Sequence, residues 1–166
     1  MSLKSTKSFL TGLVVLIASL TLVLPLWALD DSRNPEDWYQ RAYEDLKMAE
    51  MAYEDTDYYD QICFLSHQAI EKMLKGLLIE NNIVPERTHL TTKLLRRLSA
   101  HRPDLEDQFE DFRKLDRIYI PSRYPKIGYS FTQAKAVSCF ETAKGFSEKI
   151  EWIGSEAKPF SSFRNE

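Results

Sequence analysis

Apolar residues recur every three or four positions along most of this 166-residue chain, and this spacing is the feature that most constrains its fold. One such stripe begins near residue 38 and consists of Trp38, Ala42, Leu46, Ala49 and Tyr53. This spacing places side chains on one face of an α-helix, whereas a half-buried strand alternates at every residue. No convincing alternation follows residue 30, so the sequence predicts an all-α domain.

Capping residues and prolines divide the stripes into separate helices. Asn34-Pro35-Glu36-Asp37 combines a capping side chain, a proline for the first position and acids for the first turn, which predicts a helix start. A second helix is expected from about residue 57 to Asn81-Asn82. Its apolar stripe is wide enough for a central helix with neighbours on more than one side.

Beyond Val84-Pro85, Thr88 is placed to cap a short third helix. Another helix is expected around residues 105–118, and the last one over about 131–157. The segment between them, residues 120–130, contains two prolines and is predicted to be non-helical. Short connections between amphipathic helices favour antiparallel neighbours, so we expect an up-and-down bundle.

Residues 1–29 differ from the rest of the chain. From Ser8 to Leu29 there is no charge, and this stretch is long enough to span a bilayer. Lys4 and Lys7 before it would keep the N-terminus inside and place the following domain outside. A membrane anchor, a signal peptide and an over-extended start all fit residues 1–29. The helical domain then covers residues 30–157, followed by a flexible tail at 158–166.

Composition excludes several functional classes. A net charge of −3 argues against a generally basic nucleic-acid coat. The three histidines have no helical i,i+4 spacing and no HExxH pattern, and the scattered glycines form no phosphate loop, so no metal or other cofactor is expected. Cys63 and Cys139 lie on apolar faces of separate helices, where buried thiols are the favoured prediction. A disulfide is expected only if the domain is exported.

A basic island interrupts the acidic domain between residues 113 and 126. It contains Asp116 and five cationic residues, namely Arg113, Lys114, Arg117, Arg123 and Lys126. Tyr119, Tyr124 and Tyr129 interleave with these cations, a pattern typical of surfaces that hold phosphates and stack bases. Spacing alone equally allows an Arg123 that caps a helix end or pairs with Glu71.

A second polar group lies on the predicted central helix. Gln68, Glu71 and Lys75 follow i,i+3,i+7 spacing and therefore share one face. The simpler interpretation is a solvated edge with an ordinary Glu71–Lys75 pair, which stabilises a helix by a few tenths of a kcal/mol, roughly. The alternative is a face that supports a functional site on a neighbouring helix.

Several ordered motifs resemble the HEPN domain family over about residues 35–155. They are Gln68-Ala69-x-Glu71-Lys72-x-x-Lys75, Thr88-His89-x-x-x-x-Leu94-Leu95, Ser122-Arg123-Tyr124-Pro125 and the helix with Ala134 and Ala143. The resemblance implies a bundle of four long helices plus a short one, usually a homodimer. It also implies an active cleft between the last two long helices, lined from both subunits.

Many HEPN proteins are metal-independent RNases with an Arg-x4-6-His motif and act as toxins beside a minimal nucleotidyltransferase antitoxin. Here the six positions after Arg123 end at Tyr129 and contain no histidine, which fits the Arg-x4-x-Tyr variant of the motif. The resemblance therefore implies an endoribonuclease with Arg123 and Tyr129 as catalytic residues. Arg96 and His101 form a literal Arg-x4-His at the end of the short helix, which we interpret as coincidence.

In this interpretation Arg123 binds the phosphate and Tyr129 acts as base or acid, provided that neighbouring cations lower its pKa. Glu71 and Asp116 are expected to orient Arg123, with Gln68 and Lys75 in support. The expected RNA-binding residues are Arg117, Lys126 and Tyr124, and Tyr129 or Tyr124 would accept a nucleotide from the partner enzyme.

Three hypotheses follow. The first is a cytoplasmic RNase toxin, and the second is a non-catalytic HEPN module that binds a nucleotide or a partner protein. The third is a helical domain anchored in a membrane or exported through residues 9–29.

Overall fold

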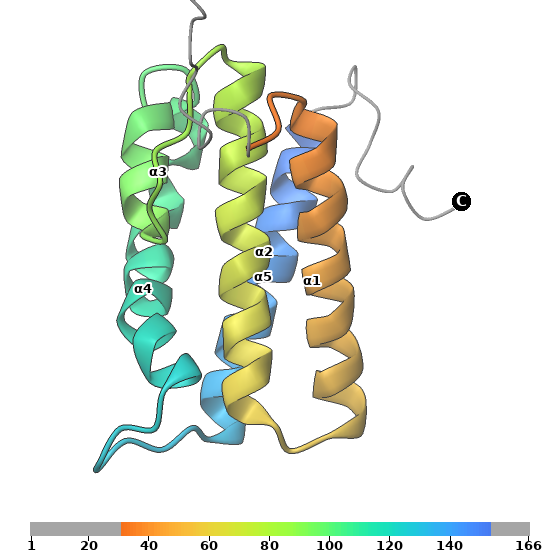
Figure 1. Ribbon diagram of the computed structural model, residues 1–166, viewed down its shortest axis with the longest axis vertical. Coiled ribbons are helices and arrows are strands. Elements are labelled where there is room, and N and C mark those ends of the chain that lie inside the picture. The colour runs from red at the N-terminus through yellow and green to blue at the C-terminus, as the bar shows by residue number, and fades with distance from the viewer. Residues whose placement is uncertain (1–30, 154–166) are drawn as a thin grey trace, which may run out of the picture. The chain divides into compact units, whose positions relative to one another are not determined.

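The computed structural model describes residues 31–153, in which every regular element is a helix (Figure 1). The long helices are α1 (Pro35–Asp55), α2 (Tyr59–Glu80), α4 (Phe109–Arg123) and α5 (Gln133–Ile153). A short helix, α3 (Thr91–Leu98), and a 3-10 helix, η2 (Pro103–Gln108), separate α2 from α4. Successive long helices run in opposite directions, which confirms the predicted up-and-down bundle with an extra short helix.

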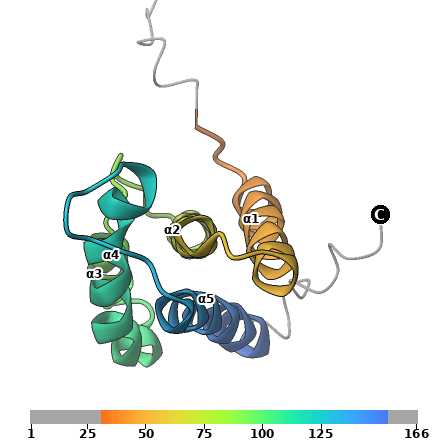
Figure 2. The ribbon, with the colours of Figure 1, turned by 90° about the horizontal axis from the view of Figure 1, so that it is seen from below.

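Helix α2 lies at the centre of this arrangement. It packs against α1, α3, α4 and α5, and the view along its axis shows these helices on several of its sides (Figure 2). Twelve of its residues are buried, including Ile70, Met73 and Leu74, because neighbours cover most of its circumference. The width of its apolar stripe therefore predicted its position correctly.

The ends of the first two helices follow from local chemistry. The Asn34 side chain accepts a hydrogen bond from the Glu36 backbone N–H at 3.3 Å, which confirms the predicted cap of α1. At the end of α2, Asn82 adopts a left-handed conformation with φ of 58°. The N–H groups of Asn82 and Ile83 then donate to the carbonyls of Ile79 and Leu78, which is the Schellman termination of a helix.

The segment predicted to be non-helical is shorter than expected. Helix α4 continues through Pro121 and ends at Arg123, so the prediction was wrong for residues 120–123. Pro121 removes one N–H donor from the last turn of α4, and other contacts hold this turn. Ser122 is buried there and donates to the Tyr119 carbonyl at 2.7 Å.

The predicted N-terminal hydrophobic segment, residues 1–29, and the predicted tail, residues 158–166, lie outside the described residues. Within residues 31–153, no helix combines the length and the apolar character needed to cross a bilayer.

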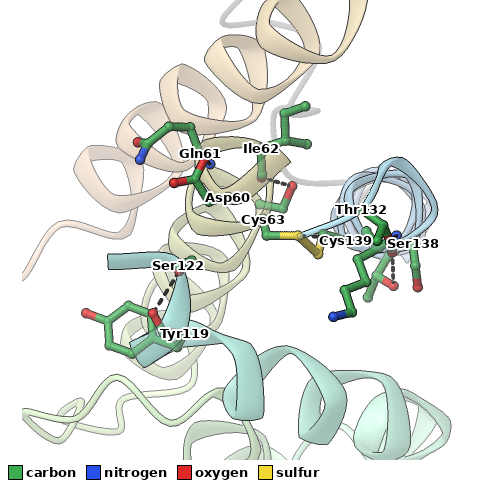
Figure 3. The surroundings of a disulfide bond; sticks show 12 residues. Asp60, Gln61, Ile62, Cys63, Tyr119, Ser122, Thr132, Ser138 and Cys139 are labelled. Atoms are coloured by element: carbon green, nitrogen blue, oxygen red, sulfur yellow. Dashed lines mark hydrogen bonds between the residues drawn. A yellow bond between two sulfur atoms is a disulfide. The ribbon is translucent and has the colours of Figure 1, made fainter. Parts of the chain in front are cut away.

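The prediction of two free buried thiols was wrong. Cys63 on α2 and Cys139 on α5 form a disulfide (Figure 3). Their Cα atoms are 5.1 Å apart, within the range that a disulfide spans, because α2 and α5 pack directly against each other. This pairing depends on helix packing, which the positions of the two cysteines in the sequence do not reveal.

Removing the disulfide should destabilise the bundle, because a link across 76 residues restricts the unfolded chain. For the double variant Cys63→Ala/Cys139→Ala we expect the free energy of unfolding to fall by about 4 kcal/mol, which denaturant titration measures. Reductant should destabilise the wild type similarly and leave the variant unchanged. Equal sensitivity of both proteins to reductant would contradict a structural disulfide.

A glycine in the middle of α2 permits close packing of α1. A Cβ atom at Gly76 would lie 2.6 Å from a ring carbon of Tyr39, a distance that real Cβ contacts do not reach. Tyr39 is itself buried, so its ring has little room to move. Gly145 on α5 provides the opposite case, because a Cβ there would meet no atom within 4 Å.

We therefore expect Gly76→Ala and Gly145→Ala to have opposite effects. Gly76→Ala should lower the free energy of unfolding by roughly 1–2 kcal/mol, since overpacking outweighs the gain in helix propensity. Gly145→Ala should raise it by about 0.5–1 kcal/mol through propensity alone. Chemical denaturation of both variants checks this, and stabilisation by Gly76→Ala would show that the Tyr39 ring moves aside freely.

Candidate functional site

Arg123 is the last residue of α4, and its guanidinium is held by a tyrosine one turn earlier. Its Nη1 donates to the hydroxyl of Tyr119 at 3.0 Å. This hydrogen bond raises the pKa of Arg123, so the side chain remains charged. The guanidinium carbon also lies 5.4–5.8 Å from the ring centroids of Phe64, Tyr119 and Tyr124, within the range of cation–π attraction. Arg123 remains exposed and has N–H groups left for a ligand.

Tyr129 lies in the loop between α4 and α5 and has different neighbours. Its ring meets Phe131 edge-on with centroids 5.1 Å apart, and Lys135 Nζ lies 4.3 Å from its centroid. Burial raises the pKa of Tyr129, so the condition that neighbouring cations lower it is not met within the described chain. Although both residues belong to the described range, no hydrogen bond or ring contact joins Tyr129 to Arg123 there.

Asp116 caps a helix other than its own. Its two carboxylate oxygens accept the backbone N–H groups of Thr91 and Thr92 at 2.8 and 3.1 Å, and also both threonine hydroxyls. These residues form the first turn of α3, whose N-cap residue has no side-chain cap of its own. The predicted capping residue of this helix, Thr88, instead accepts only the N–H of Leu90.

The same carboxylate reaches the centre of the bundle. His67 on α2 is fully buried, and its Nε2 lies 3.2 Å from Asp116 Oδ1. Burial alone would raise the pKa of Asp116, but hydrogen bonds from His67, Thr92 and Thr91 outweigh it and lower the pKa to about 2. The ionised carboxylate only accepts hydrogen bonds, so His67 donates through Nε2.

Glu71 forms a second buried centre on α2. Lys75 Nζ donates to one of its oxygens at 2.8 Å, and His89 Nδ1 lies 3.0 Å from the other, which Gln68 also approaches at 3.3 Å. Burial favours a higher pKa, but Lys75 and His89 together hold the pKa of Glu71 below its ordinary value. The predicted face of Gln68, Glu71 and Lys75 is thus one connected polar group.

Neither acidic side chain contacts Arg123. Both Glu71 and Asp116 are engaged with other partners, and the only hydrogen bond of the Arg123 side chain within residues 31–153 goes to Tyr119. The expectation that these carboxylates orient Arg123 was therefore wrong. A neutral phenol holds the guanidinium instead and leaves its positive charge uncompensated.

The basic island is smaller in the structure than in the sequence. Arg113 pairs with Glu110 and Lys114 pairs with Asp111, each on the same helix. Of the five cations of the island, three are exposed and have no carboxylate partner within the part of the chain that the structure describes, namely Arg117, Arg123 and Lys126. Tyr124, which is 59% exposed, lies beside Arg123. The positive charge is thus concentrated around the end of α4.

The HEPN domain family model matches residues 35–153, which span the helices from α1 to α5. The chain belongs to the HEPN domain family. Among solved structures it resembles TT1696 from Thermus thermophilus, with 29% identity and a TM-score of 0.62 over 69% of this chain and 93% of that one. It also resembles ST0689, an archaeal HEPN homologue, with 33% identity and a TM-score of 0.57 over 75% and 98% of the two chains. Comparison with curated proteins gives no match.

Two residues of this HEPN domain contribute to the site without a predicted role. Tyr119 holds Arg123 and was noted only as one of the interleaved aromatic residues. His89 belongs to the Thr-His motif and stacks on Tyr119 with ring centroids 5.2 Å apart. The i,i+4 spacing of Tyr119 and Arg123 would have indicated their contact if α4 had been expected to continue through Pro121.

Replacing Asp116 should uncouple α3 from the rest of this HEPN domain. Because folding lowers the pKa of Asp116 from 3.8 to about 2, its charge contributes about 2 kcal/mol. This contribution is complete above pH 4 and is lost as the pH falls towards 2. We expect Asp116→Asn to lower the free energy of unfolding by about 2 kcal/mol at pH 7 and to lose this part of the acid dependence.

Asp111→Asn is the matched control, because Asp111 lies on the same helix and pairs only with Lys114 at the surface. Its effect should stay within about 0.5 kcal/mol. Equal unfolding curves for the two variants between pH 2 and pH 7 would contradict the assigned role of Asp116.

Proposed function

We propose that this HEPN domain is a metal-independent endoribonuclease and the toxin subunit of a module with a minimal nucleotidyltransferase antitoxin. In this proposal Arg123 binds the scissile phosphate, while Arg117, Lys126 and Tyr124 bind the flanking RNA. The working form is a homodimer, as the resemblance to HEPN toxins implies. Family membership supports the general assignment, and the surroundings of Arg123 support the phosphate site.

The observation that carries the proposal is the state of Arg123. Its guanidinium is exposed, oriented by Tyr119 and without a carboxylate partner within residues 31–153. An arginine in this state can donate two parallel hydrogen bonds to a phosphate and stabilise the charge that develops during cleavage. The exposed ring of Tyr124 provides a surface on which a base can stack.

The proposed role of Tyr129 is to donate a proton to the leaving oxygen. Because burial raises the pKa of Tyr129, its hydroxyl is protonated at neutral pH. A protonated phenol suits the leaving oxygen better than it suits removal of a proton from the 2′-hydroxyl. Gly128, with φ of 74°, and the hydrogen bond from Tyr129 N–H to the Lys126 carbonyl at 3.1 Å define the turn that carries it.

The proposed regulation is nucleotidylation of a tyrosine beside Arg123 by the partner enzyme. Tyr124 is the more accessible acceptor, since it is 59% exposed whereas Tyr129 is half-buried. A nucleotide on either hydroxyl would place a negatively charged phosphate near the three exposed cations and would compete with RNA.

We propose a cytoplasmic location because the substrate is RNA. One observation favours the alternative, an anchored or exported domain that uses residues 9–29. The disulfide between Cys63 and Cys139 is of a kind that persists mainly in oxidising compartments.

The test is to express the full chain in a bacterial host and to incubate the purified protein with single-stranded RNA. Arg123→Ala should relieve growth arrest and lower the cleavage rate by at least about 100-fold, since the main phosphate contact is lost. Tyr129→Phe should also relieve the arrest. Growth curves and gel analysis of the RNA provide the two measurements.

Arg113→Ala is the control, because this arginine lies on the same helix but pairs with Glu110. It should remain toxic and cleave RNA at the wild-type rate. Full toxicity of Arg123→Ala and Tyr129→Phe would refute the proposal. Binding of RNA or a nucleotide by the wild type without cleavage would support the non-catalytic HEPN module instead.

A further inference from the structure

A histidine from another part of the chain shares the tyrosine that holds Arg123. His89 lies in the loop between α2 and α3, and its ring stacks on Tyr119 with centroids 5.2 Å apart. The Tyr119 hydroxyl in turn accepts the hydrogen bond from Arg123 at 3.0 Å. An imidazole and a guanidinium are thus placed on one aromatic side chain, although 34 positions separate them in the sequence.

A buried carboxylate fixes which ring nitrogen of His89 is available. The Nδ1 atom lies 3.0 Å from Glu71 Oε2, and the Glu71 side chain is only 5% exposed. The other oxygen of Glu71 accepts from Lys75, so this carboxylate is held from two sides. Because an ionised carboxylate can only accept, Nδ1 carries the hydrogen, and Nε2 of the neutral ring has a free lone pair.

A purely structural role does not explain the exposure of His89. His67 stacks on the same tyrosine and also pairs with a carboxylate, but its side chain is completely buried. The His89 side chain is 60% exposed, although its Nδ1 pairs with a carboxylate in the same way. A residue that served only to fasten the loop would gain more by burying its ring. The exposure instead leaves the His89 ring open to a ligand.

We propose that His89 is the general base of the reaction, with Glu71 as the residue that positions it. This inference rests on the proposed RNase function and supplies the histidine that the segment after Arg123 lacks. Histidine suits the role because, as a residue type, it accepts and releases protons near neutral pH. Because Glu71 on α2 holds His89, the position of this base does not depend on the loop that carries Tyr129.

Nε2 of His89 takes the proton of the 2′-hydroxyl, and the O2′ atom forms a bond to phosphorus. The bond from phosphorus to O5′ breaks, and the leaving oxygen takes a proton from Tyr129 or from water, which gives a 2′,3′-cyclic phosphate and a 5′-hydroxyl. The imidazolium then releases its proton to the solvent. This proton replaces the one that the leaving oxygen took, and where that proton came from Tyr129, water passes it back to the phenol. Arg123 stabilises the charge on the non-bridging oxygens throughout.

The experiment compares His89→Ala and His89→Asn with His101→Asn, using the purified full chain and a short single-stranded RNA. The asparagine amide can still donate to Glu71 but cannot take up a proton, so it separates a loss of fold from a loss of the base. His101 is an exposed histidine in the turn after α3 and serves as the control. Circular dichroism shows whether each variant is folded.

We expect both His89 variants to cleave about 100- to 10,000-fold more slowly than the wild type, the range that one general base contributes. Their affinity for RNA containing a 2′-deoxy nucleotide at the cleavage site should change less than about twofold, since His89 is not a phosphate ligand. The wild-type rate should fall as histidines protonate at acidic pH, and this decrease should be absent in the His89 variants. His101→Asn should match the wild type in rate and pH dependence.

The outcomes separate the two proposals. If the wild type cleaves RNA and His89→Asn cleaves it at the same rate with the same pH dependence, His89 is not the base and the RNase function stands. If the wild type leaves RNA intact, the RNase function and the role of His89 fail together. If His89→Asn binds the 2′-deoxy RNA much more weakly, His89 is a binding residue and its assignment as base is overturned.

Discussion

The hydrogen bonds of the largely buried Asp116 carboxylate are the interaction on which the arrangement of this site depends. The carboxylate caps the N-terminus of α3 and accepts a hydrogen bond from His67 on α2, so a single side chain of α4 joins three helices. Asp116, Tyr119 and Arg123 are separated by three and four residues, which puts them on the same face of α4. Fixing Asp116 against α2 and α3 therefore also fixes the direction of the next two turns, where Tyr119 contacts both His67 and Arg123.

Most of the fold could be predicted because it depends on local chemistry. The cap at Asn34 and the stop at Asn82 each act within one or two helical turns, and the wide apolar stripe of α2 follows from the helical period. Each lies where the sequence indicated. The end of α4 was wrong for a related reason. Pro121 is a local stop signal, but contacts of the last turn, among them the buried Ser122, allow the helix to continue.

The site was less predictable because its contacts join distant segments. The sequence indicated Arg123 and its cationic neighbours, but it paired Arg123 with Tyr129 through the spacing of the Arg-x4-x-Tyr motif. The structure relates Arg123 to Tyr119 on its own helix and, through that ring, to His89 from another loop. The Glu71–His89 pair and the Cys63–Cys139 bond likewise depend on which helix faces meet, and one sequence does not provide this information.

The disulfide also gives the chain a closed topology. Residues 63–139 form a covalent ring that contains most of α2, all of α3 and α4, and the start of α5, whereas α1 lies outside it. The loop with Ile127, whose side chain is fully exposed, belongs to the ring, and exposed loops of this kind are where proteases cut. A single cut there would open the ring without releasing either part. The two fragments would separate only after reduction.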